Sequence, residues 1–155
     1  MNSFVVYEME YTGKDIPPDG TAPVPFSEAY GAEYMRIYNA CFYEMRKALH
    51  IQPFDCYSDI QQIRKKASGL FLLPCKETII GSVGCFGSEI DDLIVNPDCR
   101  HTGYGTALLR WAVRHIRTYS DAPVSLHVAE WNQAALNLYR KNGFAVKSRE
   151  IIRYP

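Results

Sequence analysis

Apolar and polar positions along the chain follow two different periods, which divide it into strands and helices. An alternating pattern, typical of strands, occurs between Ser3 and Tyr11 and recurs in short segments of the second half. Apolar residues three to four positions apart, typical of helices, follow Ser27, Gly103 and Asn132. The predicted strands are Ser3–Tyr11, Gly69–Lys76, Thr78–Phe86, Glu89–Val95, Val124–Ala129 and a last strand or pair of strands over Phe144–Tyr154.

The helical segments have recognisable ends. Ser27 has the side chain of an N-cap, Pro53 breaks the first helix, and Gly143 suits a left-handed cap at the end of the last one. The predicted helices are Ser27 to about His50, a short one from Ser58 or Asp59 to Lys66, Gly103–Tyr119 and Asn132–Asn142.

This order of elements predicts an α/β fold with a mixed sheet of about six to seven strands flanked by about four helices. The strands Glu89–Val95 and Val124–Ala129, joined by a helix, should be parallel with a right-handed crossover. A chain of 155 residues is long enough for one substantial core and too short for two ordinary domains. We therefore expect a single domain over residues 1–155.

Composition excludes several classes of function. Lys plus Arg and Asp plus Glu each number 17, so no net field attracts nucleic acid or an anionic membrane. The N-terminal stretch is unlike a signal peptide, and no apolar run approaches the ~20 residues of a membrane span. The five cysteines form no Cys-x-x-Cys pair, and His50, His101 and His115 lack ligand spacing. We expect a cytoplasmic protein with reduced thiols, no metal, no membrane contact and no nucleic-acid partner.

The segment after the strand Glu89–Val95 has the composition of a phosphate-binding loop. Gly103 and Gly105 lack a Cβ, so the backbone can turn sharply and several amides can converge on one anion. The helix that follows adds unpaired N–H donors and the positive end of its dipole. A Gly-x-Gly pair alone is more often a turn, but the Walker A and dinucleotide patterns fit poorly here. The candidate phosphate-binding residues are Arg100, His101, Thr102, Gly103, Tyr104, Gly105 and Thr106.

Two motifs stand out in this half of the chain. The first is Val95-Asn96-Pro97 followed by Arg100-His101-Thr102-Gly103-Tyr104-Gly105. The second consists of Asn132, Ala135, Leu138, Tyr139, Gly143 and Phe144. In this order and spacing the two motifs resemble those of the GCN5-related (GNAT) family of N-acetyltransferases, and the clear resemblance covers about residues 79 to 155.

The resemblance implies acetyl-coenzyme A as co-substrate, bound where two central parallel strands splay apart. We expect the strands to part at Asn96-Pro97, because proline cannot donate to the sheet. The resemblance also implies that the backbone of Leu93, Ile94 and Val95 holds the pantetheine arm. One of these amides would polarise the thioester carbonyl, and the loop would bind the pyrophosphate.

The second motif supplies two further site residues by the same analogy. Asn132 would hydrogen-bond the cofactor, and Tyr139 would be the general acid to the departing thiolate. They lie seven residues apart on one helix, which places them on the same face. A phenol titrates near ~10 and is therefore protonated at neutral pH.

The general base has more than one candidate. Strand alternation puts Glu89 and Asp91 on the face of Leu93 and Val95, near the expected thioester, whereas Asp92 should be a solvated strand residue.

Resemblance offers two positions for the same role. Glu89 stands where histone-modifying relatives carry a catalytic glutamate, and His127 where ribosomal-protein acetylating relatives carry a basic residue. An imidazole suits proton abstraction near neutral pH, most simply through a water molecule. Sequence alone leaves the choice among Glu89, Asp91 and His127 open.

The first long helix is rich in aromatic residues at helical spacing, namely Tyr30, Tyr34, Tyr38, Phe42 and Tyr43. Such a stripe is more often core than a ligand site. In the family that the motifs resemble, however, the first helices form a wall of the acceptor pocket.

The predicted function is an N-acetyltransferase in which a primary amine attacks the donor directly in a ternary complex. The acceptor is either a small-molecule amine or a protein N-terminus or lysine. The alternative is a non-catalytic coenzyme A-binding sensor or interaction module of the same fold, against which an intact Tyr139 argues. A homodimer is possible, because an edge strand at the C-terminus can be paired or exchanged.

Overall fold

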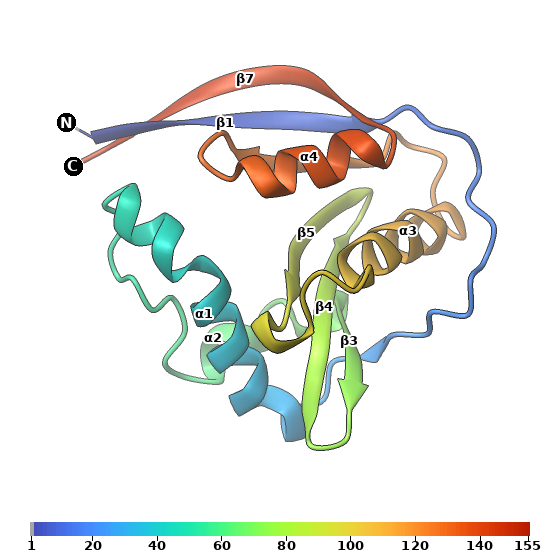
Figure 1. Cartoon of the computed structure of the whole chain (residues 1–155), viewed down its shortest axis with the longest axis horizontal. Coiled ribbons are helices and arrows are strands. Elements are labelled where there is room, and N and C mark those ends of the chain that lie inside the picture. The colour runs from blue at the N-terminus through green and yellow to red at the C-terminus, as the bar shows by residue number, and fades with distance from the viewer. Residues whose placement is uncertain (1) are drawn as a thin grey trace.

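The computed structural model describes residues 2–155, which form one seven-stranded mixed sheet in the order β2-β3-β4-β5-β6-β1-β7, with helices on both faces (Figure 1). The strands are β1 (Asn2–Tyr11), β2 (Val24–Pro25), β3 (Leu70–Cys75), β4 (Thr78–Phe86), β5 (Glu89–Val95), β6 (Ser125–Ala129) and β7 (Phe144–Tyr154). The helices are α1 (Gly31–Ala48), α2 (Gln61–Arg64), α3 (Tyr104–Arg117) and α4 (Gln133–Lys141). The predicted fold class is confirmed.

Element boundaries differ little from the prediction. The two-residue strand β2 lies between the first predicted strand and the first predicted helix, where the sequence predicts no strand, and β7 is one continuous strand at the sheet edge. The short helix α2 covers only Gln61–Arg64, and Asp59 accepts a hydrogen bond from the Gln61 amide. Asn132 caps α4 by accepting from the Ala135 amide, and Gly143 ends that helix with a φ of 90°. Local cap chemistry therefore fixed these ends as the residues indicated.

Two apolar clusters hold the helices to the sheet. The first, called the α3–α4 core here, consists of Met9, Val83, Cys85, Ile90, Leu108, Leu109, Ala112, Val113, Ile116, Val124, Leu126, Val128, Leu136, Tyr139 and Phe144. The second, called the α1 core, lies on the other face and consists of Tyr34, Ile37, Ile63, Leu70, Leu72, Ile79 and Ile94. The sheet is thus covered on both faces, which explains why β4 is apolar almost throughout.

The two central parallel strands pair over a very short stretch. Glu89 lies opposite Ser125 and Ile90 opposite Leu126, and no further pair joins β5 to β6 among the described residues. The splay is confirmed, but its expected position at Asn96-Pro97 is wrong, because the strands part directly after Ile90.

A bulge in β5 accounts for the early separation. The pairing of β5 with β4 shifts register between Ser82 and Gly84, and Asp92 has a left-handed φ of 52°. A bulge adds one residue to a strand, bends it and increases its twist. Beyond this point β5 follows β4 and leaves β6.

The bulge also changes which side chains share a face. Ile90 and Leu93 contact the α3–α4 core, whereas Ile94 is buried in the α1 core. Simple alternation would have put Ile90 and Ile94 on the same face. The expectation that Glu89 and Asp91 share a face with Leu93 is therefore wrong, since the additional residue reverses the alternation between them.

Gly81 allows β4, β5 and α3 to pack at this point. A Cβ on Gly81 would overlap the carbonyl oxygen of Ile94 and lie 2.9 Å from Leu108 Cδ1. We predict that Gly81→Ala lowers the free energy of unfolding by about 1–3 kcal/mol, the usual cost of overpacking. Gly105→Ala is the control, because its Cβ would meet nothing closer than 3.5 Å. Urea denaturation measures both variants, and an unchanged midpoint for Gly81→Ala would contradict this packing.

Candidate active site

The gap between β5 and β6 is a cavity of about 240 Å³ whose walls come from four elements. Its lining residues are Tyr38, Phe42, Met45 and Arg46 of α1, Ile90, Asp91, Asp92 and Leu93 of β5, His127, Val128 and Ala129 of β6, and Asn132, Ala135 and Tyr139 at and in α4. The cavity thus joins Tyr139, Asn132 and the base candidates His127 and Asp91 to the aromatic helix α1. Glu89 and the phosphate-loop candidates lie outside its lining.

The phosphate-loop candidates form the entry to α3. Gly103 has a φ of 87° and precedes the helix without a side-chain cap. The Ala107 amide donates to the Gly103 carbonyl, whereas the amides of Tyr104, Gly105 and Thr106 have no acceptor within residues 2–155. Three convergent N–H groups at the positive end of a helix suit an anion such as a pyrophosphate.

The first half of the loop is exposed and turns sharply. His101 has a φ of 63°, and the Thr102 hydroxyl donates to the Cys99 carbonyl over 2.5 Å. The Arg100 guanidinium lies 3.5 Å from Cys41 Sγ of α1, and this thiol lies 3.3 Å from the Val95 carbonyl oxygen, so the charge is close to the end of β5. All seven loop candidates therefore lie together, at the end of β5.

Two residues of β5, Asp92 and Leu93, lie outside both ladders. Ile94 and Val95 lie opposite Ser82 and Gly81 of β4, whereas Leu93 has no partner on β4 or β6. Leu93 also lines the cavity. Among the three predicted backbone positions, Leu93 is the one best placed to hydrogen-bond a ligand in the gap.

Tyr139 projects from α4 into the cavity and is almost fully buried, with its ring 6.1 Å from that of Phe144. Burial, and secondly the charge of Asp91, raises the pKa of its hydroxyl above the ordinary value. The group is therefore protonated at neutral pH and can donate. Asn132 uses its side-chain oxygen to cap α4, which leaves its amide nitrogen available toward the same cavity.

Two of the base candidates are in contact with each other. His127 Nδ1 lies 3.0 Å from Glu89 Oε1, and its Nε2 lies 3.4 Å from Glu8 Oε2. Lys147 in turn pairs with Glu8 and Glu10. His127 lines the cavity, whereas Glu89 is not among the lining residues and contacts the cavity only indirectly, by its bond to His127.

Glu8, which contacts His127, is a residue of the candidate site that the sequence did not indicate. It meets His127 because the two residues are partners in the antiparallel pairing of β1 with β6. No motif signals such a contact, which depends on the register of strands far apart in the sequence.

The third base candidate, Asp91, also lines the cavity. Burial raises the pKa of its carboxyl group, and the negative charge of Asp92 raises it further. Asp91 therefore accepts a proton at a higher pH than an ordinary carboxylate does.

Asp92 is not the solvated strand residue that was expected. Its side chain is only 10% exposed, and Oδ2 forms an ion pair of 2.5 Å with Lys66 Nζ. Its Oδ1 accepts a hydrogen bond from the Tyr38 hydroxyl at 3.3 Å. Strand alternation missed this arrangement because the bulge turns Asp92 toward α1.

The aromatic residues of α1 divide between the two interpretations. Tyr34 is fully buried in the α1 core, as the core interpretation predicts. Tyr38 and Phe42 line the cavity, as expected of an acceptor wall. Tyr30, directly before α1, packs against the α1 core, and its hydroxyl donates to the Lys76 carbonyl of the β3–β4 turn. The Tyr43 ring packs against Phe54 and does not line the cavity.

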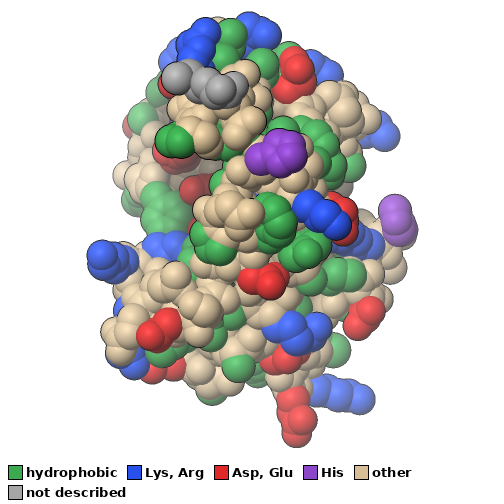
Figure 2. All heavy atoms as spheres, turned by 90° about the vertical axis from the view of Figure 1, so that its left-hand side faces the viewer, with side chains coloured by type: hydrophobic (Ala, Val, Ile, Leu, Met, Phe, Trp, Pro, Cys, Tyr) green, Lys and Arg blue, Asp and Glu red, His purple; other side chains and the backbone are tan. Residues whose placement is uncertain are grey.

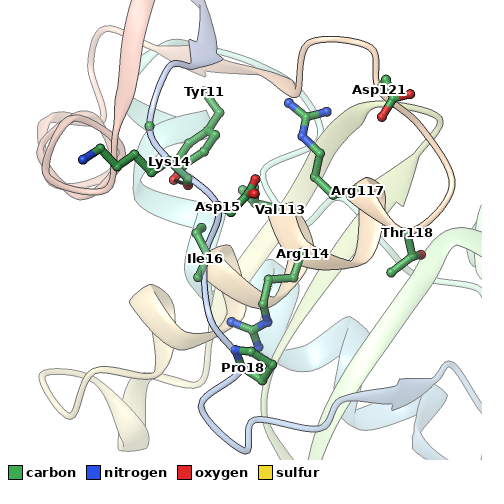
Figure 3. A pocket seen from close by; sticks show the side chains of 11 residues that line it. Tyr11, Lys14, Asp15, Ile16, Pro18, Val113, Arg114, Arg117, Thr118 and Asp121 are labelled. Carbon is green, nitrogen blue, oxygen red and sulfur yellow. Dashed lines mark hydrogen bonds between the residues drawn. The ribbon is translucent and has the colours of Figure 1, made fainter.

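A second hollow of about 520 Å³ lies between the segment after β1 and α3 (Figure 3). Arg114 donates to the Pro17 carbonyl and lies 3.5 Å from Asp19, while Arg117 donates to carbonyls after α3. Both arginines are thus bound to the protein itself, Arg114 to the segment after β1 and Arg117 to the segment after α3. Neither guanidinium is free to bind a ligand in this hollow.

The surface carries both signs of charge. On the side that includes α1 and both chain ends, acidic and basic side chains are interspersed (Figure 2). Within residues 2–155, no three metal-binding side chains gather into a possible ion site. In the same part of the chain, no helix has the length and apolar character needed to cross a membrane.

Two curated proteins match part of the chain. An uncharacterised N-acetyltransferase of Methanocaldococcus jannaschii is 32% identical over 66 residues, which are 43% of this chain and 28% of that protein. A mycothiol acetyltransferase of Segniliparus rotundus is 36% identical over 63 residues, 41% of this chain and 24% of that protein. The matched stretch therefore spans about a quarter of each relative.

Solved structures share the whole fold at low identity. A GNAT-family acetyltransferase from Colwellia psychrerythraea has a TM-score of 0.72 and 15% identity, over 97% of this chain and 56% of that one. The PaiA N-acetyltransferase of Thermoplasma acidophilum, in complex with coenzyme A, has a TM-score of 0.57 and 17% identity, over 81% and 90%.

The sequence profile of the acetyltransferase (GNAT) family matches residues 31–144. This range includes α1, the bulged strand, the phosphate loop and Tyr139, and it covers well over half of the chain. The protein therefore belongs to the GNAT acetyltransferase family.

Proposed function

We propose that this protein transfers the acetyl group of acetyl-coenzyme A to a primary amine by direct attack within a ternary complex. The observation that carries the proposal is the gap between β5 and β6, which opens beside the unpaired amides of α3 and contains Tyr139. The acceptor is a small-molecule amine or a protein N-terminus or lysine.

The phosphate loop supports coenzyme A as the carrier of the acyl group. The amides of residues 104–106 and the charge of Arg100 suit a pyrophosphate at the end of β5. Beyond the loop, Leu93 offers an unpaired backbone to the pantetheine arm. The relative from Thermoplasma acidophilum, which shares the fold, is described with coenzyme A bound.

The donor supplies an acetyl group activated as a thioester. The Leu93 amide would hydrogen-bond the thioester oxygen, where negative charge develops as the amine nitrogen forms its bond to the carbonyl carbon. When the carbon–sulfur bond breaks, the sulfur needs a proton. Tyr139 suits this role, because burial keeps its hydroxyl protonated and its side chain lines the cavity.

The attacking amine must lose a proton. We assign its removal to His127, which lines the cavity and is held through Nδ1 by Glu89. The proton would be accepted at Nε2, which lies 3.4 Å from Glu8 Oε2, so the imidazolium would lie between two carboxylates. A carboxylate in this position fixes the orientation of the ring and stabilises the imidazolium that forms. Asp91 is the alternative base, since it also lines the cavity.

The first test concerns the donor. We expect acetyl-coenzyme A to bind tightly in calorimetric titration, and removal of its 3′,5′-diphosphate end to weaken binding. Gly103→Glu should weaken binding by ~10-fold or more, because it brings a carboxylate to the anion site. Gly103→Asn is the control, since asparagine tolerates the left-handed backbone of Gly103 and adds no charge. Absence of binding to the unaltered protein would overturn the proposed cofactor.

The second test separates an enzyme from a coenzyme A sensor. In a screen of amines with detection of free thiol, Tyr139→Phe should lower kcat by ~10²-fold or more and leave the affinity for coenzyme A unchanged. Tyr119→Phe, at an exposed tyrosine, should keep full activity. Tight cofactor binding with no thiol release from any amine would favour the sensor.

The third test concerns the base. His127→Gln should lower kcat by ~10²-fold, and Glu89→Gln by less, because Glu89 acts through the histidine. Binding of coenzyme A should stay unchanged in both variants. A larger loss of kcat in Asp91→Asn than in His127→Gln would assign the role to Asp91 instead.

A further inference from the structure

The bulge of β5 is held by a cluster of side chains that the reaction itself does not use. Asp92 has a φ of 52°, a conformation uncommon for residues with a Cβ, in the middle of a strand. Such a conformation persists only where the surroundings enforce it. The side chain of Asp92 shows what enforces it here.

The carboxylate of Asp92 is fixed at both oxygens. Lys66 Nζ lies 2.5 Å from Oδ2, and the Tyr38 hydroxyl donates to Oδ1 at 3.3 Å. Lys66 also contacts the Tyr57 hydroxyl. The side chains of Lys66 and Asp92 are 20% and 10% exposed, so water screens this ion pair only weakly.

Three tyrosine rings enclose the ammonium group. Lys66 Nζ lies 5.6 Å from the ring centre of Tyr34, 5.0 Å from that of Tyr38 and 4.6 Å from that of Tyr57. Aromatic faces attract a cation that has lost its water. Burial lowers the pKa of Lys66, but the charge and hydrogen bond of Asp92 outweigh this and keep it above the ordinary value.

These contacts connect the acceptor wall to the donor strand. Tyr38 belongs to α1 and lines the cavity, and Tyr57 and Lys66 lie in the segments before and after α2. Asp92 directly precedes Leu93, and neither residue has a pairing partner on β4 or β6. The ion pair of Asp92 with Lys66 therefore lies one residue from the Leu93 amide, although Lys66 is not among the residues that line the cavity.

We propose that Lys66 is a positioning residue, which through Asp92 holds the β5 bulge in the conformation that directs the Leu93 amide to the thioester oxygen. The inference rests on the proposed acetyl transfer for the identity of the bound oxygen. The order of β5 itself is independent of that function.

Hydrogen exchange of the β5 amides tests the structural part without any ligand. Lys66→Met should raise the exchange rate of residues 89–96 by ~10-fold or more, because it leaves the Asp92 charge without its partner. Lys65→Met removes an exposed lysine one residue earlier and is the matched control. Unchanged exchange in Lys66→Met would overturn the proposal.

Kinetics test the functional part. Lys66→Met and Asp92→Asn should each lower kcat by ~10-fold or more, with the affinity for free coenzyme A within ~3-fold of the original value, because the phosphate loop is untouched. The infrared carbonyl band of bound acetyl-coenzyme A, labelled with carbon-13, should move toward its position in water. The double variant should lose no more than either single one.

Asp92→Asn keeps the evaluation possible if Lys66→Met fails to fold, since asparagine tolerates the left-handed backbone and removes only the charge. Unaltered kcat in Asp92→Asn would overturn the role of the ion pair. A parallel loss of kcat and coenzyme A affinity would also overturn it, by pointing to a general structural effect. If the unaltered protein neither binds nor turns over acetyl-coenzyme A, the proposed function itself fails.

Discussion

The separation of β5 from β6 is the constraint on which the candidate site depends. Paired strands use up their backbone groups, and a parallel ladder along the whole of β5 would leave none for a ligand. Here only two pairs join the strands, and the bulge at Asp92 turns β5 away. The same turn sends Ile94 into the α1 core and Leu93 toward the α3–α4 core. One added residue thus opens the gap, and it also places the neighbouring residues Leu93 and Ile94 on opposite faces of the sheet.

Close packing beside the bulge sets the position of the phosphate loop. The absence of a Cβ at Gly81 lets β4 approach the Ile94 carbonyl and Leu108 of α3, so the helix lies directly against the strand that precedes it. Its first turn lies beside the end of β5 and beside α4, because a Cβ on Gly105 would be 3.6 Å from Val95 Cγ2 and 3.5 Å from Leu138 Cδ2. No side chain within residues 2–155 caps this turn. Such an uncapped helix start costs stability in the free protein and suits a site where an anion supplies the missing acceptor.

Features that depend on neighbouring residues were predictable, and features that depend on register were not. Gly143 and Asn132 end and begin α4 through local backbone chemistry, so the sequence indicated both. The bulge depends on the ion pair of Asp92 with Lys66, and the contact of His127 with Glu8 depends on the pairing of β1 with β6. These contacts form only after the sheet has assembled. Alternation assigns every second residue to the same face of the sheet, so it cannot show where one added residue moves the following side chains to the opposite face.

Tyr38 connects the α1 wall of the cavity to the bulge of β5. Its ring faces Lys66, its hydroxyl binds Asp92, and its side chain lines the cavity. A substitution that reshaped the acceptor wall at Tyr38 would therefore also disturb the bulge. Phe42 and Met45 line the same cavity with apolar side chains that have no hydrogen bond to give to Asp92. In the proposed reaction, acceptor preference can therefore change at these two positions while β5 stays in place.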